Sequence, residues 1–491
     1  MKILFVSPEV APLARTGGLG DVVGALPLAL KALGADVRVL CPLHRSVSAA
    51  LRGTRLPGEI RFTGSPKQRR FRIRETRLPK AEVPVYLIEH KQLFDRPGIY
   101  AGPGGDHPDN HERAFALCQA ALALPEFLRW FPNIHHAHDW MAAPLPAFLN
   151  TLPPDVPTGK AASVLTIHNL EHQGVFPPQG FALSGLPSSY FRLDGFEHYG
   201  NLNLLKGGIQ HADKITTVSP TYSEEIKTET HGHGLHPALL YRAADLVGVL
   251  NGIDVSIWNP KTDPALPRPF SAHDAETGKT VARHALSREL GLPHRPKTAL
   301  FGVVSRLYSQ KGLDLLAQAL PALLEKNDFQ LALLGSGAPA EEQAFLRLAE
   351  RFPQHVAARI GFDEALARLI FAASHFFLMP SRFEPCGLAQ QYAMSYGALP
   401  IARHTGGLAD TIIDPTAAPS KATGLLFEQA TSDTLAKAIS RALSLHARPA
   451  RLARLRHNAM NRPASWTQSA RQYLDLYQWA VDARKQKTKS T

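Results

Sequence analysis

Two cations and one carboxylate in the second half of the chain have the types and spacing expected of a site for a phosphorylated sugar. Arg306 and Lys311 follow the apolar run at 299–304, and a helical pattern begins directly after them at Gly312. Cations on such a strand-to-helix loop lie where the helix N-terminus also attracts a phosphate. Glu384 follows a second apolar run, and its carboxylate could accept hydrogen bonds from sugar hydroxyls. A solvated basic loop is the simpler interpretation of the cations taken alone.

Adjacent glycines precede a helical pattern once in each half of the chain, at Gly17–Gly18 and at Gly406–Gly407. Glycine lets the backbone approach a ligand closely, and the free N–H groups at the start of a helix attract anions. Either loop alone is more simply a tight turn between a strand and a helix. One such loop in each half favours a cleft lined by opposed helix N-termini, because open parallel sheets bind ligands beyond the carboxyl ends of their strands.

Histidines cluster at the end of one predicted strand. On a strand, His136 and His138 would share a face, as two metal ligands do. No third ligand follows at short spacing, so a polar strand end that opens into the cleft is the better interpretation. His168 ends another strand. A structural histidine is the simpler interpretation, but its place beside the other strand ends favours the cleft. The histidines within 231–236 are typical of a flexible loop.

The chain of 491 residues carries 54 Lys and Arg against 42 Asp and Glu, a formal net charge of +12. Nucleic acid, a membrane surface and a phosphorylated small molecule are all possible anionic partners. Eight of the cations lie in the segment 61–80, but only Phe62 and Phe71 could stack on bases there, and no nucleic-acid-binding module is recognisable. We therefore expect a solvated β-hairpin in this segment, a solvated basic tail from Arg484 onwards, and no binding to nucleic acid.

The three cysteines, Cys41, Cys118 and Cys386, are too far apart for a disulfide framework or a CxxC metal motif, which fits a reducing cytoplasm. The apolar run at 2–6 is too short for the core of a secretion signal. The best apolar stretch, near 115–124, is shorter than the roughly 20 residues of a membrane-spanning helix. The sequence therefore predicts a soluble, cytoplasmic protein that does not enter a membrane.

Short, continuous apolar runs alternate with amphipathic segments along most of the chain, which is typical of parallel sheets covered by helices on both faces. Strands are expected at 2–6, 37–40, 83–88, 134–137, 162–167, 215–218 and 246–250, and then at 299–304, 329–334, 356–360, 375–379, 399–402 and 424–427. A weakly patterned, Pro-rich stretch at 259–296 separates the two series. We expect an α/β protein with two doubly wound, Rossmann-like domains, 1–255 and 256–465, that face each other across the cleft.

Eight motifs, in one order and spread from Lys2 to about Tyr477, resemble those of the bacterial glycogen synthases and plant starch synthases. They lie at residues 15–22, 138–140, 168–169, 218–222, 250–254, 305–313, 381–388 and 405–411. The resemblance implies the GT-B fold, with a C-terminal helix in 466–491 that crosses back to the first domain. It also implies a retaining glucosyltransferase that moves glucose from ADP-glucose to an α-1,4-glucan such as glycogen and needs no metal ion or other cofactor.

The resemblance further implies roles for individual residues. The catalytic residues would be Glu384, His168, Arg306 and Lys311. Donor binding would involve Arg15, Gly17, Gly18, Asn251, Arg306, Lys311, Phe362, Cys386, Gly387 and Leu388, with Phe362 near the adenine. Glu9 and Asp139 would lie on the acceptor side. The family's first glycine motif usually begins with lysine, so Arg15 is a departure, because a planar guanidinium and a compact ammonium are not equivalent at a phosphate.

Whether Glu384 has a second carboxylate nearby also bears on the mechanism. Retention by double displacement needs two carboxyl groups about 5–5.5 Å apart. Glu384 has no obvious partner, since Tyr392 stands eight positions later, where the broader retaining relatives often have glutamate. A front-face mechanism is therefore favoured, in which fixed cations stabilise the departing phosphate. The chain contains no Asp-x-Asp metal motif.

Two alternatives stay open. One is a GT-B glycosyltransferase that uses another sugar nucleotide or a membrane-associated acceptor, because nothing in the residues distinguishes adenine from uracil. The other is a non-catalytic protein that binds glucan or nucleic acid. Such a protein would be expected to have lost Arg306, Lys311 or Glu384, and all three are present. No pattern indicates the oligomeric state.

Overall fold

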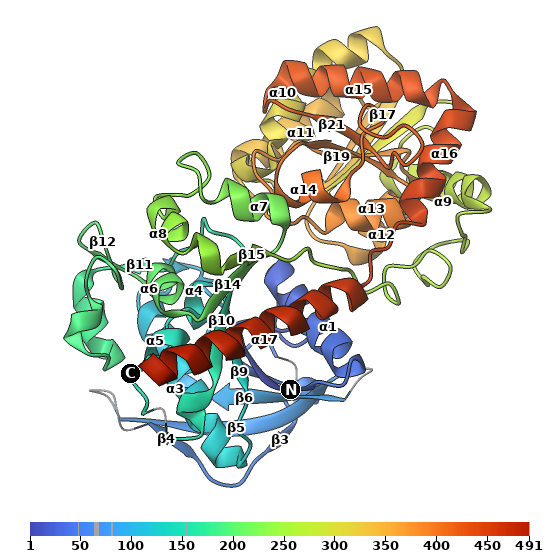
Figure 1. The fold of residues 1–491 in the computed structure, drawn as a ribbon. Coiled ribbons are helices and arrows are strands. Elements are labelled where there is room, and N and C mark those ends of the chain that lie inside the picture. The colour runs from blue at the N-terminus through green and yellow to red at the C-terminus, as the bar shows by residue number, and fades with distance from the viewer. Residues whose placement is uncertain (48, 63–67, 80–81, 154, 491) are drawn as a thin grey trace. The chain divides into compact units, whose positions relative to one another are not determined.

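The computed structural model describes residues 1–47, 49–62, 68–79, 82–153 and 155–490. The chain divides into two compact units (Figure 1). The first unit is Met1–Gly252 together with Trp466–Thr491, and the second is Ile253–Ser465. Within the described ranges, no helix has both the length and the apolar character that a membrane crossing requires.

The first unit is built on a sheet with the strand order β15-β14-β10-β9-β1-β2-β6-β5-β3, and β4 pairs with β5. The strands from β15 to β6 are parallel. They are β1 (Lys2–Val6), β2 (Asp36–Pro42), β6 (Val83–Glu89), β9 (Ile134–His138), β10 (Ala162–Ile167), β14 (Lys214–Thr217) and β15 (Leu246–Gly248). Every strand expected from an apolar run in this half is present. Two small antiparallel sheets contain β7 (Ala101–Gly102), β8 (Gly105–Asp106), β11 (Val175–Phe176), β12 (Glu197–His198) and β13 (Asn201–Asn203).

The edge of this sheet is antiparallel and includes the basic segment. β3 (Thr54–Arg55) and β4 (Ile60–Phe62) both pair with β5 (Arg69–Leu78), which also pairs with β6 along its length. The predicted hairpin is therefore present, but the expectation that it is solvated is wrong for Arg69. Its guanidinium is buried, 3.3 Å from the Glu112 carboxylate. Lys67 and Lys80 of this segment lie outside the described residues.

The helices of the first unit are α1 (Gly18–Ala32), α2 (Lys91–Phe94), α3 (Asn110–Leu128), α4 (Asp139–Ala142), α5 (Leu145–Asn150), α6 (Leu204–His211), α7 (Pro220–Glu225), α8 (His236–Tyr241) and α17 (Trp466–Ser490). The C-terminal helix α17 packs against α1 and β10 (Figure 1). It buries Trp466, Tyr473 and Tyr477 in one apolar cluster with Phe5 of β1. α17 is thus part of the first unit, although the whole second unit precedes it in the sequence.

The second unit has a parallel sheet in the order β18-β17-β16-β19-β20-β21. Its strands are β16 (Ala299–Val304), β17 (Phe329–Gly335), β18 (Val356–Ile360), β19 (Phe376–Met379), β20 (Leu399–Arg403) and β21 (Leu425–Phe427). Its helices are α9 (Ala275–Leu290), α10 (Leu313–Lys326), α11 (Pro339–Arg351), α12 (Glu364–Ala373), α13 (Ala389–Ser395), α14 (Gly406–Thr411), α15 (Ser432–His446) and α16 (Pro449–Met460). The strands again match the predicted apolar runs.

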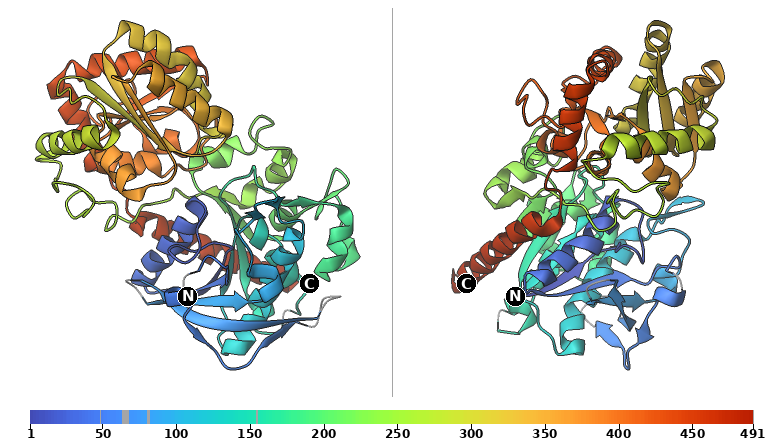
Figure 2. Two further views of the ribbon diagram at one scale, coloured as in Figure 1. Left: turned by 180° about the vertical axis from the view of Figure 1, so that it is seen from behind. Right: turned by 90° about the vertical axis from the view of Figure 1, so that its right-hand side faces the viewer.

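Helices cover both faces of this second sheet (Figure 2). Alternate side chains of β16 and β17 belong to two different apolar clusters. Phe301 and Leu331 pack in a cluster with residues of α10 and α15. Leu300 and Ala332 pack in the other, with residues of α9 and α12. Strands that are apolar on both faces explain why the sequence has continuous apolar runs instead of alternating ones.

The stretch 259–296, which has no clear pattern in the sequence, contains a helix and a buried carboxylate. α9 occupies its second half. The fully buried side chain of Asp263 lies 3.0 Å from the Arg368 guanidinium and accepts a hydrogen bond from the Tyr396 hydroxyl. Because both partners are more than 100 positions away, the sequence gives no local signal of this contact.

Replacing Asp263 with alanine should destabilise the second unit by about 3 kcal/mol, because the buried Tyr396 hydroxyl loses its acceptor and the Arg368 guanidinium loses its buried carboxylate partner. Arg368 would keep its contacts with the Ile257 carbonyl and the Glu364 carboxylate. Urea unfolding of the purified variant measures the loss. Glu59→Ala is the control, since Glu59 forms an exposed pair with Arg72 at 3.2 Å, and its removal should cost less than about 1 kcal/mol. Equal losses in the two variants would contradict the structural role of Asp263.

Candidate active site

The central contact of the second unit's candidate site is an ion pair between two sequence-predicted residues. Lys311 Nζ donates to Glu384 Oε2 at 2.6 Å, and the Ser381 hydroxyl donates to the same oxygen at 3.0 Å. The Lys311 side chain is 17% exposed and that of Glu384 only 8%. This pair joins the loop after β16 to the loop after β19. Because both charges have lost most of their water, each needs a partner whether or not a ligand is bound.

A second set of contacts fixes the same two loops and was missed by the sequence reasoning. Arg382 forms a bidentate pair with Asp314, with both N–O distances at 2.7 Å. Its guanidinium also donates to the Ser309 carbonyl at 2.6 Å, and its backbone N–H donates to the Gln310 carbonyl at 2.8 Å. Arg403 donates in turn to the Arg382 carbonyl. Such a frame fixes the positions of Lys311 and Glu384 before any ligand arrives.

Two further predicted donor-site residues have exposed side chains. Arg306, at the end of β16, is exposed, with its guanidinium 6.0 Å from the Tyr308 ring. Phe362, in the loop after β18, is 79% exposed. The next residue, Asp363, caps α12 by accepting a hydrogen bond from the Leu366 N–H at 3.0 Å. An aromatic ring this exposed on a fixed loop is available to stack on a planar ligand.

The turn that follows Glu384 requires glycine. Gly387 has a φ of +68°, and a Cβ there would lie 2.4 Å from Gln390 Oε1. The Gln390 amide nitrogen donates to the carbonyls of Cys386 and Gly387 at 2.9 and 2.8 Å. Leu388 then precedes the first residue of α13. The sequence-predicted turn into a helix at these residues is therefore present.

The second glycine pair packs against this turn. A Cβ on Gly406 would lie 2.0 Å from the Glu384 carbonyl oxygen, and a Cβ on Gly407 would lie 2.1 Å from that of Cys386. The Gly407 N–H donates to the Glu384 carbonyl at 3.1 Å. These glycines permit close contact between two loops, so the simpler interpretation as a tight turn holds for this pair. The Gly407 N–H is thus paired within the protein.

In the first unit, Glu9 organises the loop that contains Arg15 and Gly17. Its buried carboxylate accepts hydrogen bonds from the Thr16 N–H at 2.6 Å, the Thr16 hydroxyl at 2.7 Å and the Gly17 N–H at 3.3 Å. The Tyr100 hydroxyl also donates to it, at 2.7 Å. The sequence reasoning missed Tyr100, which lies 91 positions from Glu9. The Gly17 amide is therefore directed at Glu9 in this structure.

Arg15 and Gly18 lie at the start of α1. The Arg15 guanidinium is 2.8 Å from the Asp21 carboxylate, and its side chain is 42% exposed. Such an exposed pair contributes little to stability, so Arg15 can exchange Asp21 for a ligand anion at small cost. Gly18 is the first residue of α1. Asn251, the remaining predicted donor residue of this unit, is buried beyond the end of β15.

The histidines at the end of β9 are buried, which corrects the expectation that they open into a cleft. His135, His136 and His138 have no exposed surface. α17 packs on His136, and the Tyr477 hydroxyl lies 2.9 Å from His136 Nδ1. His136 Nε2 lies 2.6 Å from the Thr166 hydroxyl. Nowhere among the described residues do three or more His, Cys, Asp or Glu side chains form a group that could hold a metal ion.

His168 and Asp139 contact each other at the ends of neighbouring strands. The Asp139 carboxylate accepts a hydrogen bond from the His168 N–H at 2.7 Å. Asp139 has a φ of +55°, an uncommon backbone conformation for a residue with a side chain. Burial raises the pKa of Asp139 to about 7, helped by the charge of Glu9 and opposed by the N–H groups of His168 and Asn169. Burial lowers the pKa of His168 to about 3, so its ring is neutral.

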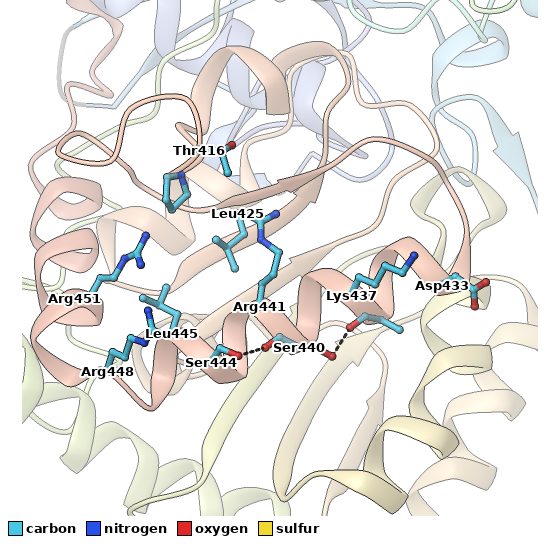
Figure 3. Close-up of a pocket in the computed structure, with 12 residues that line it drawn as sticks. Thr416, Leu425, Asp433, Lys437, Ser440, Arg441, Ser444, Leu445, Arg448 and Arg451 are labelled. Carbon is cyan, nitrogen blue, oxygen red and sulfur yellow. Dashed lines mark hydrogen bonds between the residues drawn. The ribbon is translucent and has the colours of Figure 1, made fainter.

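A pocket of about 720 Å³ lies elsewhere in the second unit, on α15 and the start of α16 (Figure 3). Its cations include Lys437, Arg448 and Arg451, which are exposed. The hydroxyls of Ser440 and Ser444 donate to carbonyls of their own helix, so they have no proton left for a ligand. None of the motif residues lines this pocket. It accounts for part of the excess positive charge and is not the candidate active site.

Comparison with known proteins gives two family matches. Residues 2–241 match the starch synthase catalytic domain, and residues 285–462 match the glycosyl transferases of group 1. Glycogen synthase 2 of Geobacter sulfurreducens is 42% identical over 99% of this chain and 100% of its own length. A glycogen synthase of Anaeromyxobacter dehalogenans is 45% identical, again over 99% of this chain and all of its own.

Solved structures agree with these matches. The catalytic domain of starch synthase IV from Arabidopsis thaliana, solved with ADP and acarbose, is 33% identical. It superposes with a TM-score of 0.90 over 98% of this chain and 99% of its own. A sucrose-phosphate synthase from Thermosynechococcus elongatus has a TM-score of 0.57 over 98% of this chain and 99% of its own. At 18% identity, that likeness concerns the fold alone.

The raised pKa of Asp139 predicts a specific pH dependence of stability. Between the unfolded pKa of about 4 and the folded value of about 7, the folded state binds the extra proton, so stability falls as pH rises, by up to about 1.4 kcal/mol per pH unit. Asp139→Asn removes this titration and keeps an oxygen that can accept the His168 N–H. The unfolding free energy of the variant, relative to the wild type, should therefore rise by about 2–3 kcal/mol from pH 5 to pH 8. A constant difference in urea unfolding across this range would contradict the buried, titrating carboxyl.

Proposed function

Because the chain belongs to the glycogen synthase and starch synthase family of GT-B glycosyltransferases, we propose that it transfers glucose from ADP-glucose to the non-reducing end of an α-1,4-glucan, with retention of configuration and release of ADP. The observation that carries the proposal is the Lys311–Glu384 pair, held by a fixed frame of loops. Support also comes from glycogen synthases 42% and 45% identical over nearly the whole chain. The related starch synthase solved with ADP supports an adenine nucleotide.

The low exposure of the ion pair favours a ligand with both a diphosphate and a sugar. A phosphate that drew Lys311 away would leave the Glu384 carboxylate without its strongest partner. Sugar hydroxyls could replace that partner by donating hydrogen bonds to the carboxylate. A sugar diphosphate satisfies both groups at once, whereas inorganic phosphate or a free sugar satisfies one. We therefore assign the donor diphosphate to Lys311 and Arg306 and the donor glucose to Glu384.

The proposed reaction proceeds on one face of the donor sugar. The bond from the anomeric carbon to the ADP oxygen breaks, the acceptor hydroxyl forms the new bond on the same face, and its proton passes to the departing phosphate. Arg306 and Lys311 stabilise the negative charge that develops on that phosphate. Tyr392, eight positions after Glu384, stacks on the Trp258 ring with centroids 3.8 Å apart and supplies no carboxylate for a double displacement. With two cations at the phosphate, we propose that transfer needs no metal ion.

The remaining sequence-predicted residues complete this proposal. Phe362 would stack on the adenine, because its ring is exposed on a fixed loop. The backbone at Gly387 and Leu388, after the buried Cys386, would face the diphosphate. The other donor-binding residues would be Arg15, Gly17, Gly18 and Asn251, and His168 would contact the donor glucose. Glu9 and Asp139 would act on the acceptor side, Glu9 through the loop that it anchors.

A glycogen-primed transfer assay tests the function. ADP-glucose should be the better donor than UDP-glucose, and chelation of metal ions should leave the rate unchanged. Glu384→Gln should lower kcat by about 100- to 1,000-fold, because it removes a fixed charge beside the reacting sugar. The matched control is Glu428→Gln, since the Glu428 side chain is 76% exposed and forms an exposed pair with His404 at 3.2 Å.

Three outcomes would contradict parts of the proposal. Full activity of Glu384→Gln would remove the role assigned to that carboxylate. Preference for UDP-glucose would favour the alternative of a GT-B transferase with another sugar nucleotide. Failure of glycogen as acceptor with any donor would reject the glucan synthase itself.

A further inference from the structure

The rings of His138 and His168 form a direct hydrogen bond in the interior of the first unit. His138 ends β9, and His168 follows the last residue of the neighbouring parallel strand β10. His138 Nδ1 lies 2.9 Å from His168 Nε2. His138 has no exposed surface, whereas His168 keeps 8%. His168 is therefore the member of the pair that can meet a ligand.

The surroundings of His138 determine which ring donates. The other nitrogen of His138, Nε2, is buried and has no hydrogen-bond partner among the described residues. If His138 accepted the bond at Nδ1, its own proton would be on Nε2, as a buried N–H without an acceptor. Orphaned buried N–H groups are rarer in folded proteins than unsatisfied acceptors, because their loss of solvation is not compensated. His138 therefore carries its proton on Nδ1 and donates it to His168.

The tautomer of His168 follows from this direction. A neutral imidazole has one N–H and one acceptor nitrogen. Burial lowers the pKa of both rings, and His136 and His168 lower that of His138 further, so both rings are neutral. Since His168 accepts at Nε2, its proton must be on Nδ1. Nδ1, the ring nitrogen of His168 that does not bond to His138, is thus a hydrogen-bond donor.

The His138 ring cannot readily turn away from this bond. It stacks on Phe5 with ring centroids 5.1 Å apart and an angle of 22° between the planes. The His136 ring contacts it as well, at a centroid distance of 4.0 Å, and His136 is itself held by Tyr477 of α17. On the other side of the bond, Asp139 accepts the His168 backbone N–H at 2.7 Å. Both the donor and the acceptor ring are therefore oriented by their own neighbours.

We propose that His138 is a positioning residue for glucosyl transfer, because its Nδ1–H fixes His168 in the tautomer that presents an Nδ1–H donor to a hydroxyl oxygen of the donor sugar. This inference rests on the proposed function, since that function places His168 at the sugar. His138 itself touches no substrate. It acts as the outer partner that sets the proton position of a functional histidine. At metal-ligating histidines, the loss of such a partner lowers affinity or activity by about 10- to 100-fold, and we expect an effect of similar size here.

Nitrogen NMR of the full-length protein with ¹⁵N-labelled histidine reads the proton position directly. The His168 signals are assigned by their loss in His168→Gln. In the wild type, Nδ1 of His168 should be protonated and Nε2 should not. His138→Asn should keep this pattern, because the asparagine Nδ2 occupies the place of the histidine Nδ1 and carries protons. His138→Phe keeps the ring but lacks a donor, and should move the His168 proton wholly or partly to Nε2.

Kinetics test whether the tautomer matters for transfer. His138→Phe should lower kcat by about 10- to 100-fold, His138→Asn should recover most of that loss, and His138→Phe combined with His168→Gln should be no slower than His168→Gln alone. A merely structural role would instead give losses that add, with no rescue by asparagine. Thermal unfolding of each variant monitors folding, and the wild-type and His138→Asn spectra remain decisive if His138→Phe does not fold.

The proposal is overturned if the wild-type His168 carries its proton on Nε2, if His138→Phe leaves it on Nδ1, or if the two substitutions act additively. Failure of the proposed function would be distinguishable from these results. A wild-type protein without glucosyltransferase activity, but with the expected His168 tautomer, would reject the function and the positioning role and leave the hydrogen-bond assignment intact.

Discussion

The ion pair between Lys311 and Glu384 is the contact on which the account of this protein depends. Two opposite charges with side chains 17% and 8% exposed cannot separate without replacement partners. In the proposed donor site, the pair would therefore select ligands by their chemistry. A ligand that brings both an anion for the lysine and hydroxyl donors for the carboxylate satisfies the pair best. A nucleotide sugar has both, whereas a DNA backbone, one of the partners that the net charge allows, has phosphates but no hydroxyl donors for Glu384.

The contacts around this pair are those of a preorganised site. Arg382 and Asp314 join the two loops from outside, and Gly406–Gly407 lets α14 approach the turn at Glu384. In the first unit, Glu9 performs the corresponding task for the glycine loop by accepting two of its N–H groups. In both units, these hydrogen bonds and ion pairs thus hold the loops of the candidate site in place. Fixed dipoles and charges stabilise a developing negative charge without the cost of reorganisation at the moment of reaction.

Sequence patterns predicted the sheets well, because each parallel strand is apolar on both faces and forms a continuous run. They also singled out Lys311 and Glu384 as candidate site residues, because their loops directly follow such runs, and the structure brings the two side chains into contact. Contacts between distant segments were not predictable. Arg69 looked solvated because its partner Glu112 lies on a helix far along the chain. Asp263 lies in a stretch without a clear pattern, and its partner Arg368 is also distant in the sequence. The contact of His136 with Tyr477 of α17 likewise joins residues more than 300 positions apart.

Binding of ADP tests the central claim most directly, because it isolates the role of Lys311 from turnover. In isothermal titration calorimetry, Lys311→Ala should weaken ADP binding at least tenfold, the equivalent of about 1.4 kcal/mol. Lys437→Ala, which removes an exposed cation from the pocket on α15, should leave the affinity unchanged. Equal affinity of Lys311→Ala and the wild type for ADP would contradict the assignment of the donor diphosphate to the Lys311–Glu384 site.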